Sequence, residues 1–244
     1  MTDRAAGSPA GGPLLLALDT SSDRGSVAVG RGAVVLARAA PAARTGQAAT
    51  LVPVVAEVLR EAGVAREDIR GIVVGEGPGS FTGVRVAGAT AKGLARGLGV
   101  PLWAGSSLAA AALGPWTPGS VAAPPVRYVL FDARADRVYG ACYRVDPDTG
   151  RAEEIVAPHG GALGTVLEGP VPDGAVFTGD AAWRHRARLE EAGHAVGGPP
   201  LGQPSADALL AWWAAHPEDE PVADTDTWEP RYVRASNAER AWAG

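Results

Sequence analysis

The 244-residue chain has one cysteine, Cys142, and one lysine, Lys92. A single cysteine excludes an internal disulfide and a zinc site built from several cysteines, and it is typical of a protein from a reducing compartment, so we expect the cytoplasm. Aromatic residues make up only 6% of the chain, and the formal net charge is −5 with a pI near 5.4. An acidic chain is not expected to hold nucleic acid through its own electrostatic field.

Long apolar runs and metal-ligand spacings are also missing. No stretch approaches the roughly 20 apolar residues that span a bilayer. Residues 1–12 lack the apolar segment of a signal peptide, so we expect a disordered tail. The histidines have neither metal-ligand nor catalytic-triad spacing, so no metal site is predicted. These histidines are His159, His185, His194 and His216.

A glycine-rich connection, residues 75–83, follows the apolar run 72–74 and leads into a helical pattern. Glycine tolerates positive φ and proline has a fixed φ, so residues 77–79 (Gly-Pro-Gly) predict an abrupt turn. Ser80 and Thr82 are candidate caps for the helix. Such a helix start attracts anions, and phosphate is its usual ligand.

A second polar turn follows the buried strand 14–18 and contains Asp19 and several hydroxyls. Neither turn has a named phosphate motif: Lys92 lies too far into the helix for a P-loop, and the third glycine of the dinucleotide pattern is missing. The two turns therefore fit either side chains that bond their own backbone or a phosphate cradle. The candidate phosphate or nucleotide contacts are Asp19, Thr20, Ser21, Gly77, Gly79, Ser80, Thr82 and Gly83.

Residues 77–87 (GPGSFTGVRVA) and 93–108 (GLARGLGVPLWAGSSL) resemble the signature of the bacterial TsaB (YeaZ-like) family. Residues 15–29, 129–143 and 229–234 match the start and the later landmarks of that family, in its order. The resemblance implies an α/β protein of the actin-like ATPase (ASKHA) superfamily, with two lobes that each contain a mixed sheet flanked by helices.

The domain organisation follows from this fold and from the proline pattern. Residues 13–113 are expected to form the N-terminal actin-like lobe, with three antiparallel strands followed by alternating helices and strands. Residues 114–125 contain four prolines in twelve positions and are expected to be a linker. Residues 126–244 are expected to form the smaller C-terminal lobe.

The resemblance also implies a function, since the family is a non-catalytic subunit of the assembly that adds threonylcarbamoyl to adenosine 37 of tRNAs reading ANN codons. The expected partners are a TsaD-like catalytic subunit and a TsaE-like ATPase, with tRNA contacted only indirectly. The related catalytic subunits carry an HxxxH metal pair, whereas residues 45–49 here read Thr-Gly-Gln-Ala-Ala, so no catalytic residue is predicted. No cofactor is expected for this chain, and ATP enters through the complex.

Two alternatives stay open. One is an independent enzyme of the same superfamily, a glycoprotease-like peptidase or a sugar-kinase-like phosphotransferase. The open DxG turn of the kinases is replaced by Asp19-Thr20-Ser21, which counts against phosphate transfer. The other is a nucleotide-sensing module without turnover.

The predicted partner surface lies on the two helices of the first lobe, 47–62 and 83–98. The first helix has an outer apolar strip besides the stripe that faces the sheet, and the second helix has small residues that allow close approach. We expect a four-helix contact with a related subunit, and a homodimer through the same surface when the chain is alone. The interface residues are Ala48, Val52, Ala56, Gly88 and Ala89.

Overall fold

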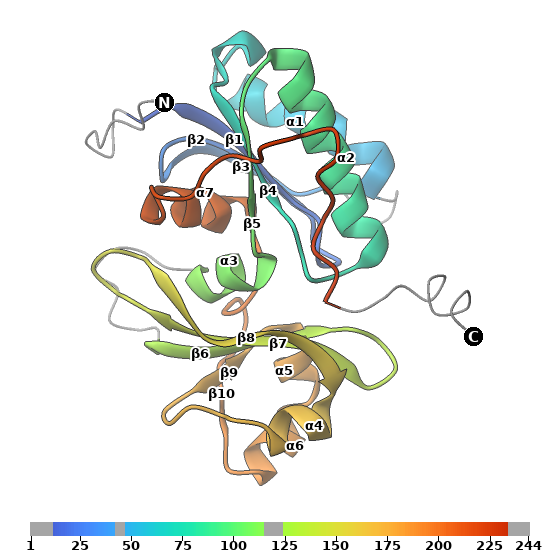
Figure 1. Cartoon of the computed structure of the whole chain (residues 1–244), viewed down its shortest axis with the longest axis vertical. Helices are drawn as coiled ribbons and strands as arrows, with labels where there is room; N and C mark the ends of the chain where they lie inside the picture. The colour runs from blue at the N-terminus through green and yellow to red at the C-terminus, as the bar shows by residue number, and fades with distance from the viewer. Residues whose placement is uncertain (1–11, 42–46, 115–123, 234–244) are drawn as a thin grey trace.

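The computed structural model describes residues 12–41, 47–114 and 124–233, without the side chains of residues 47–49. It contains two five-stranded mixed sheets, each flanked by helices (Figure 1). This architecture confirms the predicted two-lobed α/β fold, with a mixed sheet flanked by helices in each lobe. Within the described ranges, no helix combines the length and the apolar character needed to cross a membrane.

The first sheet has the strand order β3-β2-β1-β4-β5. Short turns join β1, β2 and β3 into the expected antiparallel meander, whereas β4 pairs parallel with both β1 and β5 because helices connect these strands. The elements of this part of the chain are β1 (Leu14–Asp19), β2 (Ser26–Arg31), β3 (Val34–Ala39), α1 (Gln47–Glu61), η1 (Arg66–Asp68), β4 (Gly71–Gly75), α2 (Phe81–Leu98), β5 (Leu102–Gly105) and α3 (Ser107–Leu113).

Helices α1 and α2 cover one face of this sheet (Figure 1). The buried stripe of α1 recurs every three or four residues, as an amphipathic helix requires, and comprises Leu51, Val54, Val55 and Val58. Pro53 lies inside α1, on its exposed side, and the helix begins at Gln47 as predicted. Helix α2 begins after Ser80 and ends at Gly99, whose φ of 66° suits glycine.

The second sheet has the order β10-β9-β6-β7-β8. The predicted hairpin of residues 126–132 and 137–145 is present with those bounds. The elements of this part are β6 (Val126–Asp132), β7 (Arg137–Val145), β8 (Ala152–Ala162), α4 (Leu163–Glu168), β9 (Val176–Thr178), α5 (Asp180–Arg184), α6 (Arg186–Glu191), β10 (Ala195–Val196) and α7 (Ala206–Ala215).

Helix α7 differs from the expected domain boundaries. Residues 126–244 were assigned to the second lobe, but α7 packs on β1, β2 and β4 of the first sheet. It lies with α3 between the two sheets, and Trp212 and Trp213 are buried there in a core shared by both lobes (Figure 1). The chain returns to the first lobe because this apolar helix covers the sheet face that α1 and α2 leave open. Most of the predicted linker and of the N-terminal tail lies outside the described residues.

Candidate functional site

The two polar turns predicted as a phosphate site meet at the carboxyl ends of the neighbouring strands β1 and β4. The Thr20 hydroxyl donates a 2.6 Å hydrogen bond to the carbonyl oxygen of Gly83. The Ser80 amide donates a 2.7 Å bond to the carbonyl oxygen of Ser21. The turns therefore bind each other directly.

Asp19, at the end of β1, is fully buried and accepts three hydrogen bonds. The donors are the Ser21 amide (2.8 Å), the Ser21 hydroxyl (2.6 Å) and the Ser107 hydroxyl (2.8 Å). Burial raises the pKa of the Asp19 carboxyl above its ordinary value, although these hydrogen bonds lower it. Ser107 has no signal in the sequence, because its link to Asp19 forms only when β1 and β5 lie in one sheet.

Close packing explains the glycines of the loop. A Cβ on Gly83 would lie 1.9 Å from the Thr20 carbonyl oxygen, and one on Gly79 would lie 2.3 Å from the Ser21 carbonyl oxygen. Of the glycines at 77, 79 and 83, only Gly77 has positive φ, at 94°. Glycine is therefore required at positions 79 and 83 by contact with the β1–β2 turn, not by backbone conformation.

The amides that could bind a phosphate are largely occupied. The Gly77 amide donates to the Ser107 hydroxyl, and the Gly83 amide donates to the Ser80 side chain, which is the helix cap. Thr82 lies in the first turn of α2 and is exposed, so it is not the cap. These contacts favour the structural turn over the phosphate cradle, because a ligand would have to replace bonds that the protein already makes.

The histidines have structural contacts. His216 bonds the Trp212 carbonyl through Nδ1, and His159 bonds the Tyr128 hydroxyl through Nε2. Within the described residues, no group of three or more histidine, cysteine or acidic side chains could hold a metal ion.

Some of the residues predicted for the partner surface are exposed on α1 and α2. Val52 is 57% exposed, and Ala56 and Ala89 are exposed as well. Gly88 was expected on this open surface but is buried, because Trp228 and Pro230 lie over it. The side chain of Ala48 lies outside the described residues.

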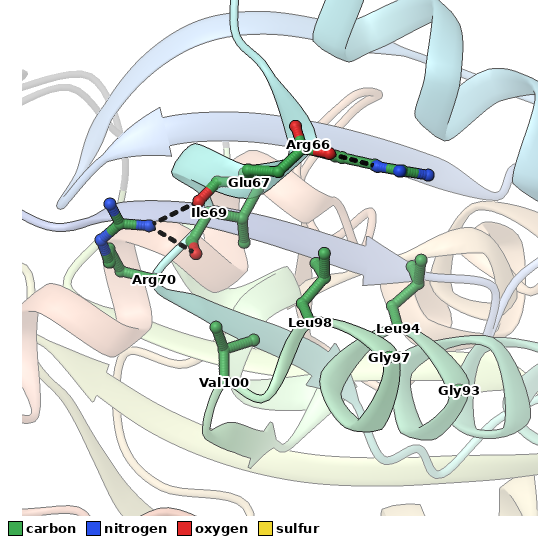
Figure 2. Close-up of a pocket in the computed structure, with 9 residues that line it drawn as sticks. All are labelled: Arg66, Glu67, Ile69, Arg70, Gly93, Leu94, Gly97, Leu98 and Val100. Atoms are coloured by element: carbon green, nitrogen blue, oxygen red, sulfur yellow. Dashed lines mark hydrogen bonds and ion pairs between the residues drawn. The ribbon is translucent and has the colours of Figure 1, made fainter.

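A hollow of about 560 Å³ adjoins this surface at the end of α2 (Figure 2). Leu94, Leu98 and Val100 form an apolar wall, and a Cβ on Gly93 or Gly97 would meet no atom within 4 Å. On the η1 side, Arg66 pairs with Glu67, and Arg70 donates to two backbone carbonyls (Figure 2).

Comparison with known families places this geometry in context. The family model that matches the chain is described as TsaD, tRNA N6-adenosine threonylcarbamoyltransferase, and it covers residues 42–178.

Individual relatives are named for the same tRNA modification as the family model. Over 241 residues the chain is 30% identical to the Bacillus subtilis tRNA threonylcarbamoyladenosine biosynthesis protein TsaB, covering 93% of this chain and 97% of the relative. The Escherichia coli TsaB is 34% identical over 134 residues, which cover 54% of this chain and 55% of the relative. The solved structure of YeaZ from Pseudomonas aeruginosa superposes with a TM-score of 0.74 at 30% identity, over 90% of this chain and 99% of that one.

Proposed function

The chain belongs to the TsaB family of tRNA threonylcarbamoyladenosine biosynthesis proteins, and we propose that within this pathway it is a non-catalytic scaffold subunit. In this role it binds and stabilises a TsaD-like catalytic subunit in the cytoplasm, and a TsaE-like ATPase joins them. It contacts tRNA only through its partners, and it forms a homodimer when alone.

The observation that carries the proposal is the exposure of Val52 on a helix whose inner stripe is already buried. Exposed apolar residues that lie together as one patch mark surfaces that bind partners, whereas a single exposed apolar side chain is ordinary. Val52 and Ala56 of α1 lie on the outer side of the pair α1 and α2, together with Ala89 of α2. Two such helices can pack against two helices of a related subunit as a four-helix contact.

The closed turns support the absence of catalysis. Asp19 has three donors around its carboxylate, and the amides of Gly77, Ser80 and Gly83 are hydrogen-bonded inside the protein. No activated nucleophile or ligand pair is assembled there. We therefore propose that the chain needs no cofactor of its own and that ATP is used by the ATPase of the complex. The same contacts count against a phosphotransferase, a peptidase and a nucleotide sensor.

The substitution Val52→Arg tests the scaffold role. It places a charge at the centre of the proposed contact without altering the buried stripe, and an unpaired charge buried in an interface costs about 3–5 kcal/mol. We expect the variant to keep its circular dichroism spectrum and to lose both the homodimer and the complex with the catalytic subunit in size-exclusion chromatography.

Ala187→Arg is the matched control, because Ala187 is also exposed on a helix but lies in α6 of the other lobe. It should leave both assemblies intact. Unchanged partner affinity in Val52→Arg would place the interface elsewhere.

A further inference from the structure

The motif at residues 229–234 has no part in the scaffold proposal so far. Residues 229–232 belong to a segment, residues 222–232, that contains a turn at 225–227 and runs along α2 (Figure 1). We call this segment the latch. Its Val222 amide donates a 2.8 Å bond to the Leu102 carbonyl of the edge strand β5, and its Arg231 amide donates a 2.9 Å bond to the Glu76 carbonyl of the glycine loop.

Between these two ends, side chains of α2 hold the latch. Lys92 Nζ donates 2.9 Å bonds to the carbonyl oxygens of Asp226 and Trp228. Arg96 pairs with Asp226 at 2.7 Å, and Arg85 Nε donates a 2.8 Å bond to the Tyr232 hydroxyl. All the basic side chains of α2 thus contact the latch.

Gly88 provides the notch into which the latch packs. A Cβ at this position would lie 3.2 Å from Cγ of Pro230 and 3.4 Å from the Trp228 ring. The latch therefore has the features of a docked peptide, with an aromatic-proline anchor in a notch and the acidic Asp226 over basic side chains.

Backbone bonds hold the latch only at its two ends; between them it is held by side chains of α2 and by Trp228, which is half-buried against the core of the first lobe. In the described structure, no backbone-to-backbone hydrogen bond joins residues 223–230 to the rest of the protein. The Arg96–Asp226 pair is exposed, and exposed pairs contribute about 0–1 kcal/mol. Because its middle has no backbone bond to the sheet, this segment should open at a lower free energy than the strands do.

The notch adjoins the proposed partner surface, since Gly88 is next to the exposed Ala89 on α2. We propose that the latch is a displaceable ligand of α2, and that a segment of the catalytic subunit with an aromatic anchor flanked by carboxylates takes its place in the notch. The chemistry of that segment follows from the groove, in which the missing side chain of Gly88 makes room for a ring and Lys92 and Arg96 supply two cations. This inference rests on the proposed scaffold function.

The test compares binding of the TsaD-like subunit of the same organism to the full chain and to Trp228→Ala. Removing the anchor leaves α2 unchanged and raises the fraction of molecules in which the groove is open. The variant should therefore bind the catalytic subunit about tenfold more tightly in calorimetry. Asp226→Ala should act in the same direction with a smaller effect. Glu220→Ala, exposed and just before the latch, is the control and should bind like the unchanged chain.

Two further measurements separate displacement from a merely structural latch. Hydrogen exchange of residues 222–232 should accelerate when the catalytic subunit binds the unchanged chain. A synthetic peptide of residues 222–233 should compete with the catalytic subunit for Trp228→Ala, and the circular dichroism spectrum of the variant should match that of the unchanged chain.

The outcomes distinguish the two proposals. Equal or weaker binding by Trp228→Ala, slower exchange in the latch, or no competition by the peptide overturns the latch alone. Absence of binding by both the unchanged chain and the variant overturns the scaffold function and the latch together.

Discussion

The Thr20 hydroxyl and the Gly83 carbonyl oxygen, 63 residues apart in the sequence, lie 2.6 Å apart in a buried hydrogen bond. The bond joins the turn after β1 to the first turn of α2. It connects the two segments that would have to separate for a phosphate to enter between them.

Thr20→Val should destabilise the fold. The substitution keeps the shape of the side chain but removes the donor to the Gly83 carbonyl, and one buried hydrogen bond contributes about 0.5–1.5 kcal/mol to stability. Urea unfolding measures the loss. Thr82→Val, exposed in the same helical turn, should change stability by no more than about 0.5 kcal/mol. Equal effects of the two substitutions would contradict the importance of the bond.

Gly83→Ala should be more damaging, because its Cβ would lie 1.9 Å from the Thr20 carbonyl oxygen. Either the turn or the helix must move, at a cost of about 3 kcal/mol or more. Gly93→Ala, on the same helix with open space around it, should be neutral or stabilise by up to about 1 kcal/mol. Thermal unfolding of the two variants, Gly83→Ala and Gly93→Ala, measures this difference. An unchanged Tm in Gly83→Ala would show that the two turns are not in contact.

Asp19 should make stability depend on pH. Its pKa is raised in the folded protein, so its contribution to stability is fully present below the ordinary value of 3.8 and is lost as the pH rises through the folded-state pKa. The substitution Asp19→Asn removes the titrating carboxyl group from this position. The free energy of unfolding of the unchanged chain minus that of the variant should therefore be largest in acid and fall toward neutral pH. Urea titrations from pH 3.5 to 7.5 test this, and a difference that grows with pH would show that hydrogen bonding outweighs desolvation.

The isolated chain should neither bind nor turn over ATP. The loop amides at residues 77, 80 and 83 already have acceptors inside the protein, so a phosphate gains few new bonds. Isothermal titration of the purified chain with magnesium ATP should give no saturable heat. Saturable binding or hydrolysis that is lost in Ser80→Ala or Asp19→Asn would instead support a nucleotide-sensing or enzymatic role.

Much of the local structure was determined by the sequence, because its causes are local. The periodic apolar stripe of α1, the cap at Ser80 and the hairpin of residues 126–145 follow from side-chain spacing, capping chemistry and turn residues close in the chain. The motifs around residue 80 also predicted the family, because they form one long, continuous match.

The sequence allows two structural interpretations of those motifs, and only the contacts of the tertiary structure favour one of them. The glycine turn fits a phosphate cradle or a closed structural turn equally well in sequence, and the choice depends on Thr20, Ser21 and Ser107, which reach it from the turn after β1 and from the start of α3. The position of α7 and the burial of Gly88 under Trp228 depend in the same way on segments more than a hundred residues away. Contacts of that range leave no periodic signal in the sequence, because they form only when the sheet brings the segments together.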